Sequence, residues 1–280
     1  MVSFGLDAGG GKMTESSAGF AITRTPAKTD GAPTLLLIHG FLDGATVWDG
    51  LIGALASEVA AVRYDLPGFG TRSAAVADAR SVSLESLAAE AGDIIAGIDG
   101  PVIVVGQSVG TQVAELVAAA HADRVPGLVL LTPVPLGGTR LPDDVTAPFR
   151  ALGGDRDAQR AVRAQLSPHL SEEQLNRLAD IGAPVAVEVT AHYVDLWNDG
   201  LRNAPTSSAF EGPVLIIRGG ADAFVTKRMV DAIRPRFADA DTETIGDGGH
   251  WVHVEYPEAV ASMILEFTRA VAALTPRRQA

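Results

Sequence analysis

The sequence predicts an α/β fold in which a mostly parallel central sheet is flanked by helices. Between residues 18 and 131, short apolar runs rich in β-branched residues alternate with longer segments of helical periodicity. Such alternation is typical of consecutive βαβ units. It stops over residues 136–205, where the pattern is helical throughout, and resumes at residue 213. We therefore expect one α/β domain that carries a helical insertion.

The first half of the predicted sheet comes from three apolar runs. An opening strand is expected over residues 20–25, and a continuously apolar strand over residues 34–38 ends at the pair H-G. Residues 46–55 repeat at helical spacing, and residues 60–64 form the next expected strand. Short apolar runs without alternation indicate strands that are buried on both faces of a parallel sheet.

The next elements surround the pentapeptide G-Q-S-V-G. A helix is expected over residues 84–98, and a strand over residues 102–105 leads directly into the pentapeptide. Apolar residues return at helical spacing over residues 111–120, and residues 127–131 form another apolar run. Ser108, the centre of the pentapeptide, is therefore predicted to lie at a strand-to-helix junction.

Prolines and glycines in T-P-V-P-L-G-G mark the departure of the chain from this rhythm. In the helical stretch that follows, Ser171 and Gln174 have the spacing of a capping box. The later elements are expected as a strand over 213–217, a helix over 227–237, a strand over 242–245 and a helix over 257–274. The predicted organisation is a flexible tail over residues 1–17, an α/β core over residues 18–135 and 206–280, and a helical cap over residues 136–205.

Composition narrows the classes of function. The chain has 280 residues, a formal net charge of −12 and no cysteine, which excludes thiolate metal sites and a cysteine nucleophile. The acidic balance disfavours nucleic acid and anionic membrane surfaces as partners. The first residues lack a basic segment followed by an apolar stretch, and no apolar run is long enough to span a bilayer. We expect a soluble, cytoplasmic protein.

Three residues can form a nucleophilic site. A serine hydroxyl becomes a nucleophile only beside a base, and the base needs an acid that orients it. Asp222 follows the strand expected at 213–217, and His250 follows the strand expected at 242–245. Because the carboxyl ends of parallel strands meet at one edge of a sheet, both should lie near Ser108. The order serine, acid, histidine along the chain agrees with a triad on this architecture.

The chain resembles the α/β-hydrolase superfamily, and within it the cap-bearing branch of haloperoxidase-, perhydrolase- and esterase-like proteins. Five motifs carry the resemblance: H-G-F at 39–41, D-L-P-G-F-G at 65–70, G-Q-S-V-G at 106–110, G-G-A-D at 219–222 and G-G-H-W at 248–251. The resemblance implies that Ser108 is the nucleophile, His250 the general base and later acid, and Asp222 the carboxylate that fixes the tautomer of the histidine. It also implies an oxyanion hole formed by the backbone N–H groups of Phe41 and Val109.

Alternatives exist for the acid and for the histidines. Asp247 also precedes His250, but we interpret it as a turn residue and favour Asp222. His250 and His253 form H-x-x-H, which could suggest a metal site, yet one catalytic and one structural histidine is the favoured interpretation, with no metal. We expect His39 to hold the oxyanion loop rather than to transfer protons.

The expected activity is hydrolysis of a carboxylic ester or lactone through an acyl-enzyme, without a cofactor. Hydrolysis of a C–C bond in a β-diketone-like compound and peracid formation of the haloperoxidase type stay open, as does a small-molecule receptor without turnover. The substrate is expected to be a neutral, partly apolar small molecule, because the insertion lacks clustered arginines and lysines. Trp251, His192, Tyr193 and Trp197 are candidates for the wall of its pocket. The alternative for His192, Tyr193 and Trp197 is packing within the cap, which is the more frequent role of such residues at helical spacing.

Overall fold

The computed structural model describes residues 12–15, 19–28, 31–74 and 78–274. These residues form an eight-stranded sheet with the order β1-β2-β4-β3-β5-β6-β7-β8. Strands β1 and β2 are antiparallel to their neighbours, and the pairs from β4 through to β8 are parallel. The strands are β1 (Lys12–Glu15), β2 (Ala21–Thr25), β3 (Thr34–Ile38), β4 (Ala60–Tyr64), β5 (Val102–Gln107), β6 (Gly127–Leu131), β7 (Val214–Gly219) and β8 (Ala240–Ile245). The predicted fold class, an α/β fold with a mostly parallel sheet, is confirmed.

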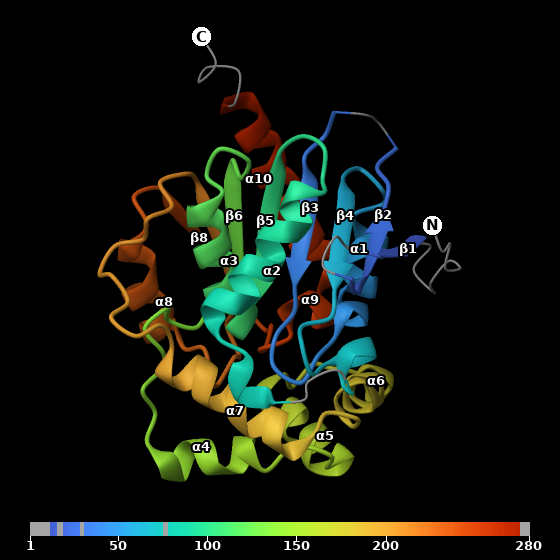
Figure 1. Ribbon diagram of the computed structural model, residues 1–280, viewed down its shortest axis with the longest axis vertical. Helices are drawn as coiled ribbons and strands as arrows, with labels where there is room; N and C mark the ends of the chain where they lie inside the picture. The colour runs from blue at the N-terminus through green and yellow to red at the C-terminus, as the bar shows by residue number, and fades with distance from the viewer. Residues whose placement is uncertain (1–11, 16–18, 29–30, 75–77, 275–280) are drawn as a thin grey trace.

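Helices cover both faces of the sheet (Figure 1). One face packs against α2 (Leu84–Ala96), α3 (Val109–Ala120) and α8 (Lys227–Ile233), and the other against α1 (Asp49–Ala54), α9 (Val252–Glu255) and α10 (Pro257–Leu274). Alternate residues of β3 enter opposite cores, since Leu36 and Ile38 belong to the first and Leu35 and Leu37 to the second. This two-sided burial explains why the parallel strands have continuous apolar sequences.

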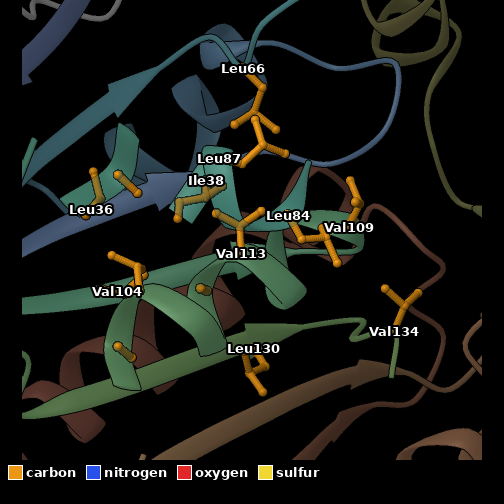
Figure 2. Packing of buried hydrophobic residues seen from close by; sticks show 14 of the residues in the cluster. Leu36, Ile38, Leu66, Leu84, Leu87, Val104, Val109, Val113, Leu130 and Val134 are labelled. Atoms are coloured by element: carbon orange, nitrogen blue, oxygen red, sulfur yellow. The ribbon is translucent and has the colours of Figure 1, made fainter. Parts of the chain in front are cut away.

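The core beside the functional site is formed by strands and by the helices α2 and α3. Figure 2 shows Leu36, Ile38, Val104 and Leu130 of the strands facing Leu84, Leu87, Val109 and Val113 of the helices. Gly106 allows β5 to approach α3, and Gly110 allows α3 to approach the end of β3. A Cβ at Gly110 would lie 2.4 Å from the backbone oxygen of Ile38, and a Cβ at Gly106 would lie 2.3 Å from that of Gly110. The two glycines of the pentapeptide are therefore required by close backbone contact.

Four helices lie between β6 and β7 in the chain, and we call residues 143–199 the helical insertion. They are α4 (Asp143–Arg150), α5 (Arg156–Leu166), α6 (Glu172–Gly182) and α7 (Val187–Asp199). Figure 1 shows them together at the end of the sheet where the parallel strands finish. The capping box predicted at Ser171 and Gln174 is present at the start of α6.

The structure departs from the predicted elements in several places. Lys12–Glu15, placed in a flexible tail by the sequence, forms β1 and pairs with β2, so the tail prediction is wrong for these residues. The rest of the predicted tail up to residue 18 lies outside the described residues. The helix α9 was not predicted, because four residues are too few for a periodic pattern. The segment 227–237 contains α8 followed by a 3₁₀ turn at Arg234–Arg236, which includes Pro235.

Candidate active site

Ser108 lies on a strained turn between β5 and α3. Its backbone angles are φ 52° and ψ −122°, in a region that L-residues rarely occupy. The N–H of Ser108 donates to the backbone oxygen of Leu131 at 3.1 Å, and its carbonyl accepts from the N–H of Thr111 at 2.9 Å. The turn is thus held from the neighbouring strand β6 and from the first turn of α3. Ser108 thus lies on a sharp turn at the carboxyl edge of the sheet, as the sequence-based assignment of a nucleophile requires.

His250 and Asp222 form a buried pair on the loops that follow β8 and β7. Nδ1 of His250 lies 2.9 Å from Oδ2 of Asp222, and each residue is only 5% exposed. The other carboxylate oxygen accepts from the N–H groups of Phe224 and Val225 at 2.8 and 2.9 Å. Burial raises the pKa of Asp222, but the imidazole and these hydrogen bonds outweigh it and lower the pKa below its ordinary value. Asp222 is therefore held as a carboxylate that can fix the ring of His250.

The backbone carbonyl of His250 is held from the centre of the sheet. It accepts from the hydroxyl of Thr132 at 3.0 Å and from Nε2 of Gln107 at 3.2 Å. Gln107 directly precedes Ser108, so one side chain links the serine turn to the histidine loop. This contact arises only when β5, β6 and the loop after β8 come together.

Ser108 and His250 line the same pocket. Its empty volume is about 490 Å³, which includes space that is open to solvent. Aromatic and aliphatic side chains line most of it, and they come from the core, the insertion and the loop after β7. They are Phe41, Leu42, Phe149, Leu152, Val162, Leu166, Trp197, Phe224 and Trp251. The polar lining residues besides Ser108 and His250 are Gln107, Gln159 and Arg163.

His39 fixes the loop that follows β3. Its Nε2 accepts from the N–H of Leu66 at 2.9 Å, so the proton of the neutral ring lies on Nδ1, which donates to the backbone oxygen of Gly40 at 2.8 Å. Burial lowers the pKa of His39 and keeps the ring neutral. Phe41, whose N–H is the predicted oxyanion donor, follows directly in this loop and lines the pocket.

Asp65 organises the D-L-P-G-F-G segment beside that loop. Its carboxylate accepts from the N–H of Ala45 at 2.6 Å and from the N–H and hydroxyl of Thr71 at 2.8 and 2.7 Å. Gly70 has φ +51°, and a Cβ there would lie 2.2 Å from the carboxylate. Asp65 and Gly70 therefore have a structural role, in holding the backbone that supports His39.

A buried ion pair joins the insertion to the loop after β3. Arg163 of α5 donates through Nη2 to the backbone oxygen of Leu42 at 2.7 Å and lies 3.5 Å from Oδ1 of Asp43. Nε1 of Trp251 donates to the other oxygen of Asp43 at 2.9 Å. Burial lowers the pKa of Arg163, and Asp43 opposes that shift. Because both charges are buried together, the guanidinium adds little net positive charge to the pocket.

Two of the four candidate pocket residues line the pocket beside Ser108 and two do not. The lining residues are Trp197 and Trp251. His192 instead bonds through Nε2 to the backbone oxygen of Val82 at 2.6 Å, and the hydroxyl of Tyr193 donates to Pro67 at 2.9 Å. Helical spacing places these residues on α7 but does not show which turn faces the pocket. Tyr193 is one turn before Trp197 and packs against Phe69, with ring centroids 4.5 Å apart.

The acidic and histidine residues considered at the histidine loop differ in burial and contacts. Asp247 is exposed, whereas Asp222 contacts the imidazole. His253 is buried against Trp48 with a distance of 4.5 Å between ring centroids, and burial lowers its pKa to about 3. Among the residues that the structure describes, no group of three His, Asp or Glu side chains could hold a metal ion. His253 is thus a packed, neutral ring.

Sequence reasoning missed the residues that reach the site from a distance. Phe149, Arg163 and Phe224 line the pocket, and Asp43 pairs with Arg163 behind it. Phe149 and Arg163 lie on helices, and the local sequence does not show which face of a helix turns toward the site. Phe224 and Asp43 lie in loops, where no periodic pattern exists. Among the described helices, none is long and apolar enough to cross a membrane.

These features agree with a match to a known family. The model of the alpha/beta hydrolase family matches residues 35–263, and the chain belongs to that family. The match includes all three residues of the predicted triad.

Two curated relatives cover most of the chain. Lipase LipV of Mycobacterium tuberculosis is 30% identical over 84% of this chain and 92% of its own. The pimeloyl-[acyl-carrier protein] methyl ester esterase of Aeromonas hydrophila is 28% identical over 84% of this chain and 95% of its own.

Solved structures agree with the fold. The esterase EaEST from Exiguobacterium antarcticum superposes with a TM-score of 0.78 at 15% identity, over 92% of this chain and 98% of that one. Bromoperoxidase from Bacillus anthracis gives a TM-score of 0.77 at 17% identity, over 92% of this chain and 99% of that one.

Proposed function

We propose that the protein is a serine hydrolase that cleaves carboxylic esters of small molecules through an acyl-enzyme. The observation that carries the proposal is the common pocket of Ser108, on its strained turn, and of His250, paired with Asp222. The names of the curated relatives, an esterase and a lipase, support ester bonds as the target.

In the acylation step, His250 accepts the proton of Ser108 Oγ as this oxygen attacks the ester carbonyl. The tetrahedral oxyanion is stabilised by backbone N–H groups, which need no proton transfer. Val109 is the first residue of α3, so its N–H has no carbonyl partner within the helix and lies at the positive end of the helix dipole. The N–H of Phe41 is the second donor. His250 then protonates the leaving alcohol as the C–O bond breaks.

In the deacylation step, the same groups act on water. His250 removes a proton from the water that attacks the acyl-enzyme, the N–H groups of Phe41 and Val109 hold the second oxyanion, and Ser108 leaves with the proton from His250. Asp222 remains ionised and orients the ring in both steps. These groups suffice for ester cleavage, so no cofactor is part of the proposal.

The lining of the pocket favours a neutral, partly apolar acyl group. Most of the wall is aromatic or aliphatic, and the charge of Arg163 is already balanced by Asp43. A substrate carboxylate would have to compete with Asp43 for the guanidinium.

The test is hydrolysis of p-nitrophenyl acetate, butyrate and octanoate by the full chain. We expect Ser108→Ala and His250→Ala each to lower kcat/KM by roughly 10⁴- to 10⁶-fold, because the nucleophile and its base act as a unit. Ser207→Ala, an exposed serine outside the pocket, is the control and should retain activity. If the wild type released no p-nitrophenol above background but bound such esters tightly, the protein would be a receptor and not an enzyme.

A second comparison tests the charge of the substrate. The p-nitrophenyl ester of butyrate should be cleaved more efficiently than the p-nitrophenyl monoester of succinate, which adds a carboxylate at similar length. A preference for the succinate ester that disappears in Arg163→Met would show instead that Arg163 binds an anionic group.

A further inference from the structure

The loop that carries His250 is bonded to the helical insertion through its backbone. The N–H of His250 donates to the backbone oxygen of Leu166, the last residue of α5, at 2.9 Å. The N–H of Trp251 donates to the hydroxyl of Ser167 at 2.8 Å. Two consecutive N–H groups at the catalytic histidine are therefore satisfied by residues that lie more than 80 positions earlier in the chain.

A third N–H group is held by Glu255 of α9. Its carboxylate accepts from the N–H of Gly249 at 2.6 Å through one oxygen and from the N–H of His169 at 3.0 Å through the other. Glu255 thus bridges the histidine loop and the segment that joins α5 to α6.

The two segments also pack without space between them. A Cβ at Gly249 would lie 2.3 Å from the Cα of Ser167 and 2.5 Å from the backbone oxygen of Leu166. Ser167 is buried, with 1% of its surface exposed. A displacement of residues 166 and 167 would therefore be transmitted to Gly249 and His250 by direct contact.

We propose that Ser167 and Glu255 are positioning residues for His250, so that the insertion forms part of the framework of the triad besides covering the pocket. This inference rests on the proposed function of His250 as the general base. Asp222 holds the ring from the loop after β7, whereas Ser167 holds the backbone from the insertion and Glu255 holds it from α9. Ser167 and Glu255 are not among the described residues that line the pocket, so their effect must pass through the histidine loop.

The experiment compares Ser167→Ala and Glu255→Gln with the wild type on p-nitrophenyl butyrate. Glutamine keeps the shape of Glu255, but its amide NH₂ cannot accept from a backbone N–H. A misplacement of a catalytic group by about 1 Å can cost up to about 100-fold in rate. We expect kcat to fall about 10- to 100-fold in each variant while KM changes less than about twofold. Because both residues hold one loop, the double variant should lose less than the product of the two single losses.

Two matched controls separate positioning from general destabilisation. Ser171→Ala removes the cap of α6 in the same linker, and Glu258→Gln neutralises an exposed carboxylate on α10. Both should retain the kcat of the wild type even where stability falls, by about 1 kcal/mol for the lost cap.

A readout independent of turnover is hydrogen exchange of the amides at residues 249–251. Exchange should be at least about tenfold faster in Ser167→Ala and Glu255→Gln than in the two controls. Wild-type kcat in both variants, or losses of kcat equal to those in the controls, would overturn the inference. If the wild type itself had no turnover dependent on Ser108, the proposed function would fail, and unchanged exchange at 249–251 would separately refute the positioning role.

Discussion

At the scale of the residue, the site depends on which atoms of each side chain are already engaged. His250 presents Nδ1 to Asp222, and this leaves Nε2 as the nitrogen that can exchange a proton with Ser108. His39, by contrast, has both ring nitrogens in hydrogen bonds with backbone groups of Gly40 and Leu66. Two buried histidines near one pocket are therefore suited to different tasks, one to proton transfer and one to holding a loop.

A comparison of two aspartates tests the assignment of the acid. We expect Asp222→Asn to lower kcat by about 10⁴-fold, because an amide that donates to Nδ1 would select the wrong tautomer of His250. Asp247→Asn, at an exposed position, should keep most of the activity. Steady-state kinetics on p-nitrophenyl butyrate measure both, and a larger loss in Asp247→Asn would reassign the acid.

At the scale of the element, the sharp passage from β5 to α3 determines where the nucleophile lies. Gly106 of β5 lies against α3, and Gly110 of α3 lies against the end of β3, so neither glycine has space for a methyl group. The N–H group of Val109, which has no carbonyl partner within α3, follows Ser108 directly in the chain. A short, exposed linker could hold a serine at the same place in the sequence, but it could not fix this geometry.

Two glycine substitutions test the role of close packing in this passage. Gly110→Ala would bring Cβ within 2.4 and 2.7 Å of the backbone oxygens of Ile38 and His39, so we expect a loss of about 3 kcal/mol or more in the free energy of unfolding. Gly53→Ala, in α1 with no atom within 4 Å of the added Cβ, should instead stabilise the protein by about 0.5–1 kcal/mol. Urea denaturation measures both, and equal effects would contradict the packing argument.

At the scale of the whole molecule, the sheet places Ser108, Asp222 and His250 at one edge, and the helical insertion contributes further walls of the pocket. The histidine loop is bonded to the centre of the sheet through Gln107 and Thr132, and to the insertion through Leu166 and Ser167. The insertion also contributes Arg163, which reaches the loop after β3. The pocket is therefore formed by segments of the core and of the insertion that are far apart in the sequence.

The buried histidines make the stability of the whole molecule depend on pH. The pKa of His253 is about 3 in the folded protein, below the ordinary value of 6.5, so the unfolded chain binds a proton between these values that the folded chain does not bind. The contribution of His253 to the free energy of unfolding is therefore fully present above pH 6.5. It is lost as the pH is lowered toward 3, by up to about 1.4 kcal/mol per pH unit. The lowered pKa of His39 acts in the same direction.

Replacement of His253 isolates its part of this effect. In His253→Phe, the free energy of unfolding from urea denaturation should fall less steeply between pH 6.5 and 4 than in the wild type, while His39 still contributes. Only the slopes are compared, because a larger ring beside Trp48 can change stability at every pH. Identical slopes would show that His253 does not carry this dependence.

The local pattern of the sequence determined most of the elements of the core. The strands Thr34–Ile38, Ala60–Tyr64 and Gly127–Leu131 have the predicted bounds, because an apolar run buried on both faces of a sheet is visible without knowledge of its neighbours. The strand β1 was missed, since a short polar edge strand depends on its partner β2 and not on its own composition.

The sequence by itself determined the α/β class and the order of the motifs, and it placed Ser108, Asp222 and His250 each after a recognisable strand. Only the tertiary structure decided that Asp222 contacts His250, that Trp197 faces the pocket while Tyr193 does not, and that Ser167 and Glu255 hold the histidine loop. The physical reason is one of range. Periodicity and turn chemistry act between neighbours in the chain, whereas these contacts join segments whose distance is set by how helices pack onto the end of the sheet.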